Sequence, residues 1–235
     1  MIIKSIKTRV FKEGKILLPF ITRYIKNLPE RSVVVVTSKI VSLSERRTAV
    51  IENVNTKLKL MRKESELVIP TRYAWLTVKD GMAMSSAGID ESNANGKLIL
   101  LPKNSFKTAH FLRKELQKKY GVKELGVIVT DSRSTPLRAA AMGAAIGYAG
   151  FKGLKDYRGK LDIFGRKFKF SRVNVADSLA IAAVLVMGEG NEQQPLAVIQ
   201  KASIEFCDKV HPRELRINAA DDMYRPLFSR LPKSI

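Results

Sequence analysis

Two short runs of β-branched and aliphatic residues constrain the fold of this chain more than any other feature of its sequence. Residues 32–37 read Ser-Val-Val-Val-Val-Thr, and residues 126–130 read Gly-Val-Ile-Val-Thr. Continuous apolar runs of this length are typical of buried strands. Each run leads into polar residues, Ser38-Lys39 after the first and Asp131-Ser132 after the second. Oxygen-bearing side chains at the end of a strand suit a metal ion and a phosphate, and they also suit a turn.

The other segments mix strands and helices without regular alternation. Further strands are predicted within residues 1–10 and at 67–69, 98–101 and 196–199, hairpins at 74–86 and 163–170, and helices at 17–28, 106–120 and 177–187. Residues 47–70 have no clear period and are interpreted as a helix that precedes the strand at 67–69. Ser38 is expected to cap a short helix with Lys39 in its first turn. This mixture favours an α+β fold over a doubly wound parallel sheet.

Two helices carry more detailed predictions. Phe111, Leu112 and Leu116 are expected on one apolar side of the 106–120 helix. The Ala-rich helix at 177–187 is expected to be buried. Residues 139–153 are small and Gly-rich, so that backbones can pack closely there or approach a ligand.

The charge of the chain raises the question of a nucleic-acid partner. Its formal net charge is +20 at pH 7, and basic surfaces bind phosphate backbones by releasing counterions. The cations are spread from Lys4 to Lys233 without a block of five or six, and only 7% of residues are aromatic. No module of interleaved aromatics is evident. Nucleic-acid binding is therefore kept as a secondary hypothesis beside the handling of anionic small molecules.

Several classes of protein are disfavoured by what the sequence lacks. No run of about 18 apolar residues indicates a membrane span, and residues 1–15 have no apolar core of a secretory signal. The single cysteine, Cys207, cannot form an internal disulfide, so we expect a cytoplasmic protein without a membrane partner. The phosphate-loop, dinucleotide and nucleophile-elbow motifs are missing. With only His110 and His211 available, a zinc site is not expected.

The remaining candidates for a functional site are oxygen-bearing side chains at the ends of apolar segments. Four polar constellations stand at 37–39, 87–93, 130–132 and 187–194. Asp90, Asp131 and Glu189 are hard carboxylate ligands of the kind that Mg²⁺ and Mn²⁺ prefer. The other candidates are phosphate-neutralising cations, hydrogen-bonding side chains and loop glycines: Lys39, Arg133, Arg138, Ser38, Asn93, Gly188 and Gly190.

Each constellation also has a purely structural reading. Asp90 before Ser92 and Asn93 suits an Asx turn or a helix cap, residues 130–132 suit the cap of a strand, and Gly188 suits a helix C-cap. Spacing alone does not bring the four segments together. The residues therefore leave a metal-dependent, phosphate-handling enzyme open without naming its substrate.

Read in order, these segments resemble a known family. TSKIVSLSER, AGIDESN, GVIVTDS with Pro136 and Arg138, AIGYAGFKGLKDYRG and ADSLA-x-AA-x-LVMGEG are similar to the coenzyme F420-0:L-glutamate ligases, where F420 is a deazaflavin coenzyme. The resemblance covers roughly residues 32–200. It predicts a ligase-like domain over residues 1–202, with room for two subdomains, and a tail at 203–235 outside it.

The resemblance implies an α+β protein that forms intertwined homodimers in the cytoplasm. It implies GTP as a substrate and two divalent cations, Mg²⁺ or Mn²⁺, with K⁺ as a further cation. The reaction would join L-glutamate to an acid acceptor through an acyl phosphate. Asp90, Asp131, Ser132 and Glu189 would be metal ligands. GTP would contact Ser38, Lys39, Asn93, Met187, Gly188, Glu189, Gly190 and Asn191, and Arg138 would contact substrate; no catalytic base is named.

The chain departs from the family in the segment after Ser132. The family usually carries an aromatic residue followed by Gly-Arg-Pro-Trp-Arg, whereas residues 133–138 read Arg-Ser-Thr-Pro-Leu-Arg. Leu43 stands where a nucleotide-contacting lysine is common, and residues 8–11 lack the usual Pro-rich segment. Three hypotheses therefore stay open: a γ-glutamyl or related amino-acid ligase, a basic nucleic-acid-binding protein on the same fold, and a nucleotide-binding regulator.

Overall fold

The computed structural model of the 235-residue chain describes residues 1–50 and 54–226. Residues 51–53 and 227–235, which belong to the predicted 47–70 segment and to the predicted tail, lie outside the described residues. The chain divides into two units. Unit 1 combines Met1–Arg47 with Pro102–Glu214, and unit 2 combines Thr48–Leu101 with the chain from Leu215 onward.

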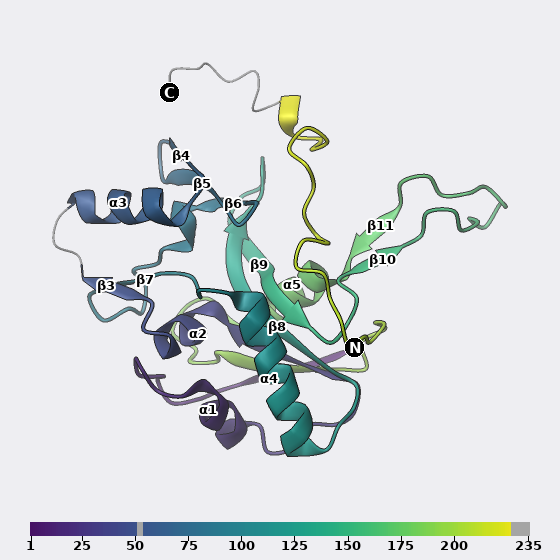
Figure 1. Cartoon of the computed structure of the whole chain (residues 1–235), viewed down its shortest axis with the longest axis horizontal. Helices are drawn as coiled ribbons and strands as arrows, with labels where there is room; N and C mark the ends of the chain where they lie inside the picture. Colours follow the sequence, from purple (N-terminus) through teal and green to yellow (C-terminus); the bar gives the residue numbers. More distant parts are fainter. Residues whose placement is uncertain (51–53, 227–235) are drawn as a thin grey trace. The chain divides into compact units, whose positions relative to one another are not determined.

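A five-stranded sheet forms the centre of unit 1, in the order β1-β12-β2-β8-β9 (Figure 1). Its strands are β1 (Ile2–Ile6), β12 (Leu196–Gln200), β2 (Ser32–Thr37), β8 (Leu125–Ser134) and β9 (Ala141–Ala149). β2 and β8 run parallel, whereas the other neighbouring pairs of this sheet are antiparallel. The four valines of β2 and residues 125–130 of β8 are buried, which confirms both predicted buried strands.

Helices cover both faces of this sheet. α4 (Ser105–Tyr120) contacts β8 and β9, and α5 (Val175–Met187) contacts β9 and β1. In Figure 1, α4 lies in front of the sheet and α5 lies behind β9. The shorter helices α1 (Leu17–Tyr24) and α2 (Ser38–Ser44) contact each other, and α2 also contacts β2 and β8.

Two glycines of β9 permit this close packing. A Cβ atom at Gly147 would lie 2.4 Å from the carbonyl carbon of Ser105 in α4. A Cβ atom at Gly143 would lie 2.7 Å from the carbonyl oxygen of Ala180 in α5. The small residues predicted to let backbones approach therefore serve a strand packed between two helices.

Asparagine caps set where the two long helices begin. The side chains of Asn104 and Asn174 each accept a hydrogen bond from the backbone N–H three residues on, 2.9 and 3.0 Å away. The predicted apolar side of α4 is only partly right, because Phe111 is 54% exposed while the two leucines of that side are buried. The predicted burial of the 177–187 helix is wrong for one face, where Leu185 is 83% exposed.

An antiparallel ribbon, called the arm here and formed by residues 154–174, extends from unit 1 (Figure 1). Its base is the pair β10 (Leu154–Asp156) and β11 (Arg172–Asn174), and a bridge joins Leu161 to Lys167 nearer its tip. The predicted 163–170 hairpin is therefore the end of a longer ribbon.

The chain after β12 packs against unit 1 up to Glu214. Phe206 bridges to Phe151, and the buried Arg113 guanidinium donates to the Leu125 carbonyl and to the Asp208 carboxylate. The Tyr148 hydroxyl donates to the Glu214 carboxylate, and burial together with this carboxylate raises the pKa of Tyr148. This part of the predicted tail is thus held by specific contacts.

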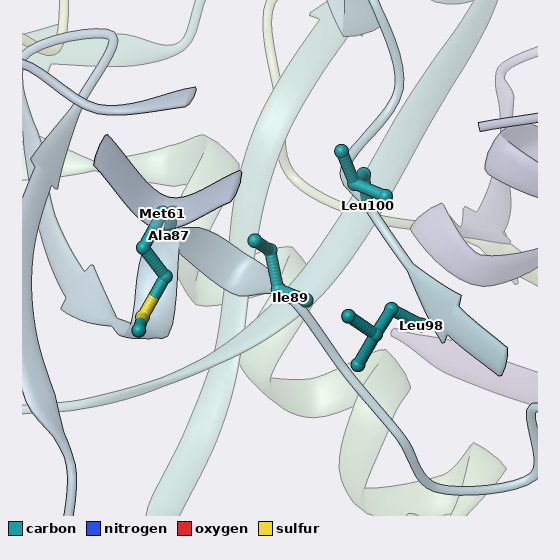
Figure 2. Packing of buried hydrophobic residues seen from close by; sticks show 5 residues of the cluster. All are labelled: Met61, Ala87, Ile89, Leu98 and Leu100. Carbon is teal, nitrogen blue, oxygen red and sulfur yellow. The ribbon is translucent and has the colours of Figure 1, made fainter. Parts of the chain in front are cut away.

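Unit 2 has its own small core (Figure 2). Its elements are β3 (Thr48–Val50), α3 (Val54–Glu64), β4 (Leu67–Pro70), β5 (Trp75–Lys79), β6 (Met82–Ser85), the 3-10 turn η1 (Ser86–Gly88) and β7 (Lys97–Ile99). The buried cluster consists of Met61, Ala87, Ile89, Leu98 and Leu100. The predicted hairpin is confirmed: β5 and β6 pair, and Asp80 and Gly81 both have positive φ, which is typical of a type I′ turn.

The described residues form five α-helices and several separate sheets without regular βα alternation, which confirms the predicted α+β class. Among these same residues, no helix is both long and apolar enough to cross a membrane.

Candidate oxygen-donor site

The carboxyl ends of the parallel strands β2 and β8 meet at one edge of the sheet, where Thr37 pairs with Thr130. The residue after each threonine has a side-chain oxygen: Ser38 follows Thr37, and Asp131 follows Thr130. Ser38 Oγ donates a 2.9 Å hydrogen bond to Asp131 Oδ1, and Ser38 is only 5% exposed. The prediction that Ser38 caps α2 is wrong, because Thr37 holds the N-cap position and Ser38 is the first helical residue. Its hydroxyl is directed to Asp131 instead.

A second hydroxyl–carboxylate pair lies on the neighbouring residue of β8. Ser132 Oγ donates to Glu189 Oε1, and Glu189 directly follows Gly188, which ends α5. β8 continues to Ser134, so Asp131 and Ser132 lie within the strand and not beyond its end as the sequence suggested. Because successive side chains of a strand point to opposite faces, the two pairs flank β8 on opposite sides.

In the loop that follows α5, the carboxylate of Glu192 lies against the loop backbone. The N–H of Gly190 donates to a carboxylate oxygen of Glu192 at 2.8 Å. A Cβ atom at Gly188 would lie 2.4 Å from the carboxyl carbon of the same residue. Asn191 is exposed, whereas Met187, the last residue of α5, is 3% exposed and belongs to the core.

Arg133 forms an ion pair that links the sheet to α5. Its guanidinium donates to Asp177 Oδ2 at 2.9 Å, and the other oxygen of Asp177 accepts the N–H of Ala145 at 2.8 Å. The Asn174 amide donates to Asp177 Oδ2 at 2.7 Å. Asp177 thus joins β8, β9 and the start of α5, and it positions the strand that carries Asp131 and Ser132.

Asp177 is the residue that sequence reasoning missed. It lies inside the quoted ADSLA segment, three residues after Asn174, and an acidic residue in the first turn of a helix with an asparagine cap is a recognisable local signal. Its contacts with Arg133 and Ala145 depend on the tertiary fold. The sequence alone does not indicate them.

The remaining unit 1 candidates lie as follows. Lys39 is half-buried in the first turn of α2, as predicted. Arg138 is exposed in a turn where its N–H donates to the Thr135 carbonyl, and the neighbouring Leu137 is 91% exposed. No contact of the Arg138 side chain with the two hydroxyl–carboxylate pairs is present among the described residues.

Asp90 and Asn93 belong to unit 2. The backbone of Asp90 exchanges two hydrogen bonds with Ile99. Its carboxylate accepts from the N–H of Ser92 at 2.7 Å and from the Ser92 hydroxyl at 2.9 Å, which is the Asx turn that the sequence left open. Asn93 is exposed and has a φ of 51°. Roles of both residues toward a metal or GTP stay predictions.

The chemistry of the donors fits hard cations. Both pairs in unit 1 present only carboxylate and hydroxyl oxygens, the ligand class of Mg²⁺ and Mn²⁺. Within residues 1–50 and 54–226, however, no three His, Cys, Asp or Glu side chains form a group that could hold a metal ion. Each pair therefore supplies one carboxylate, and the further ligands of a cation there would include water or substrate oxygens.

Comparison with known proteins identifies the class of this chain. The family described as F420-0:Gamma-glutamyl ligase matches residues 5–201. A protein named coenzyme F420:L-glutamate ligase from Methanococcus maripaludis strain C7 is 33% identical over 216 residues, which is 84% of this chain and 86% of the relative. The protein of the same name from Archaeoglobus fulgidus is 29% identical over 213 residues, covering 83% of this chain and 85% of the relative.

A more similar but shorter match comes from Methanocaldococcus jannaschii, whose coenzyme F420:L-glutamate ligase is 40% identical over 141 residues, 58% of this chain and 56% of the relative. The three relatives named above are ligases, and the chain is an enzyme of this class. It belongs to the F420-0:Gamma-glutamyl ligase family.

Proposed function

We propose that this chain is a GTP-dependent and divalent-metal-dependent ligase that joins L-glutamate to an acid acceptor through an amide bond. The relatives are named for coenzyme F420 and L-glutamate, and the family description names F420-0, so coenzyme F420-0 is the acceptor in this proposal. The observation that carries the proposal is the match to this ligase family over residues 5–201, which includes all the polar segments of unit 1.

Formation of an acyl phosphate accounts for the need for a nucleotide. An acceptor carboxylate oxygen attacks the γ-phosphorus of GTP, the bond to the β-phosphate oxygen breaks, and GDP leaves. The amine of glutamate then attacks the acyl carbon, phosphate leaves, and the amine loses a proton to water. A bound cation would neutralise negative charge on the phosphate oxygens.

The residues of unit 1 that would hold a cation are those of the two pairs. Asp131 is held by the Ser38 hydroxyl and Glu189 by the Ser132 hydroxyl, so each carboxylate is oriented before a ligand arrives. Lys39, in the same turn as Ser38, would attract a nucleotide phosphate. Two further parts of the proposal rest only on the resemblance to the family: Asp90 as a third carboxylate ligand, and K⁺ as a further cation.

A homodimer is part of this proposal. Its support in unit 1 is an apolar stripe on α5, where Ile181, Leu185 and Val186 are 39%, 83% and 42% exposed. Apolar side chains gathered on one helix face are typical of an interface. Light scattering coupled to gel filtration should give a dimer for the wild type and a monomer for Leu185→Glu, and a monomeric wild type would contradict it.

The test of the ligase proposal is nucleotide turnover that depends on both organic substrates. GDP release should require coenzyme F420-0, L-glutamate and Mg²⁺ or Mn²⁺ together, and should be lost in Asp131→Asn. Asp80→Asn, an exposed acid in the type I′ turn of unit 2, is the matched control and should keep full turnover. Release that persists without glutamate or acceptor would contradict ligation.

Binding is measured separately from turnover. A ligand that binds only the folded protein raises its free energy of unfolding by RT ln(1 + [L]/Kd), about 2.7 kcal/mol at a hundredfold Kd. Thermal unfolding should shift with GTP plus Mn²⁺ in the wild type and in Asp80→Asn, and not in Asp131→Asn. A shift without turnover would favour a nucleotide-binding regulator over the ligase.

A further inference from the structure

The turn between β8 and β9 holds a leucine in a backbone conformation that disfavours it. The N–H of Arg138 donates to the carbonyl of Thr135 at 3.3 Å, which closes a turn over residues 135–138. Proline at the second position and a φ of 55° at Leu137 are the pattern of a type II turn, whose third position normally carries glycine or asparagine. A bulky L-residue is strained there. The stability of the turn therefore does not explain why residue 137 is leucine.

Leu137 is not stabilised by burial either. Its side chain is 91% exposed. It lies in the exposed stretch 136–141, which reads Pro-Leu-Arg-Ala-Ala-Ala. In a chain with 42 lysine and arginine residues, this loop presents an apolar surface that carries one cation, Arg138. An exposed apolar surface on strained backbone is typical of a place where a ligand or a partner binds.

The turn continues the strand that carries the candidate site. Asp131 and Ser132 lie on β8, which ends at Ser134, and the turn begins at the next residue. At about 3.3 Å per residue, the turn begins roughly 13 Å from Asp131 along the strand. A substrate that reacts beside Asp131 and Ser132 would therefore reach the turn with a part remote from its reacting group.

The chemistry of the loop decides which substrate of the proposed ligase suits it. L-Glutamate is small and charged at both ends, so it offers no apolar surface to Leu137. Guanine presents several hydrogen-bonding groups along its edge, and the loop side chains at 136–141 offer hydrogen bonds only from Arg138. The acid acceptor, a deazaflavin coenzyme in the proposed function, combines a flat ring system with an acid end. A flat ring packs well on an apolar side chain, and a guanidinium group binds an anion.

We propose that Leu137 determines which acid acceptor the enzyme binds, by packing against the ring system of the acceptor while Arg138 binds an anionic group. This recognition rests on the proposed ligase function and adds the residue that selects the acceptor. Leu137 stands where the family usually carries tryptophan, so the area offered to a ring is smaller in this chain.

The experiment is steady-state kinetics in which coenzyme F420-0, L-glutamate and GTP are varied in turn. At about 25 cal/mol per Å², loss of roughly 50 Å² of apolar contact corresponds to about an eightfold change in affinity. Leu137→Asn should therefore raise KM for coenzyme F420-0 about eightfold and leave KM for GTP and L-glutamate unchanged. Leu137→Trp should lower KM for the coenzyme about threefold.

Stability separates recognition from a structural role. Asparagine tolerates the left-handed conformation, so Leu137→Asn should raise the urea midpoint while it weakens coenzyme binding. Ile16→Asn is the matched control, because Ile16 is another apolar residue of unit 1 and is 74% exposed. It should leave all three KM values unchanged.

Equilibrium dialysis of coenzyme F420-0 without GTP measures the same recognition apart from catalysis. An eightfold rise of Kd in Leu137→Asn, with a wild type that forms no product, would support the role of Leu137 and contradict the proposed ligase function. A wild type that ligates, with the same coenzyme KM in both Leu137 variants, would overturn the role of Leu137 alone.

Three further results would overturn the proposal. An equal rise in KM for GTP would assign the turn to the nucleotide. A lower urea midpoint in Leu137→Asn would mean that the leucine is needed for folding. Loss of a dimer in Leu137→Asn, with the coenzyme KM unchanged, would assign the turn to a second copy.

Discussion

Replacing Asp177 by asparagine tests how the sheet that carries Asp131 is held together. The change keeps the shape of the side chain and an oxygen for the Ala145 N–H, but it turns an amide N–H₂ toward two donors, Arg133 and Asn174. Both lost hydrogen bonds are accepted by a carboxylate oxygen, and each such bond contributes about 1.5–3 kcal/mol in a buried setting. Because the Arg133 side chain is 31% exposed, solvent screens part of this, and we expect about 2 kcal/mol.

Urea unfolding followed by circular dichroism, with linear extrapolation, measures the free energy of unfolding. A double-mutant cycle with Arg133→Gln isolates the pair, for which we expect a coupling of about 1 kcal/mol. Arg166→Gln, an exposed arginine outside this network, should change stability by less than about 0.5 kcal/mol. If Asp177→Asn also stayed within that limit, or if the coupling energy were zero, Asp177 would not stabilise the link between β8, β9 and α5.

Three further predictions concern stability. Gly147→Ala should cost about 2–3 kcal/mol, since its Cβ would lie 2.4 Å from backbone of α4, and an unchanged urea midpoint would contradict this packing. Leu98→Ala should cost about 2–5 kcal/mol in the core of unit 2, so this unit should unfold at a lower temperature than in the wild type. An unchanged unfolding temperature would mean that Leu98 is not packed as in Figure 2. The hydrogen bond from Arg113 lowers the pKa of Asp208, so Asp208→Asn should destabilise the protein at pH 7 and lose this effect as the pH falls below about 4; a difference that grows in acid would reverse the sign.

The local sequence pattern was sufficient to predict β2 and β8, whose β-branched and apolar residues favour buried strands. The valines of β2 and the residues of β8 up to Thr130 have side chains that favour strands and burial in any context. The hairpin at Asp80-Gly81 and the helix at 105–120 have equally local signals in a turn pair and in an amphipathic period. Membership in the ligase family was likewise carried by ordered short motifs.

Features that depend on contacts between distant segments could not be predicted in this way. β9 consists largely of alanine and glycine, whose strand preference is low, and it becomes a strand through pairing with β8. The hydroxyl of Ser38 suits a helix cap by local rules, and only the register of β2 and β8 places it beside Asp131. Arg133 was interpreted as a phosphate ligand, because its partner Asp177 lies 44 residues away in the sequence.

The most direct test of ligation is mass spectrometry of the product. The purified 235-residue chain with coenzyme F420-0, L-glutamate, GTP and Mn²⁺ should yield a glutamylated coenzyme. With ¹⁸O in the acceptor carboxylate, one labelled oxygen should appear in the released phosphate, as an acyl phosphate requires. Asp131→Asn should give no product, whereas Asp80→Asn should give the wild-type amount. Product without label in phosphate would refute the acyl phosphate, and GTP consumption without any glutamylated product would contradict the proposed ligase function.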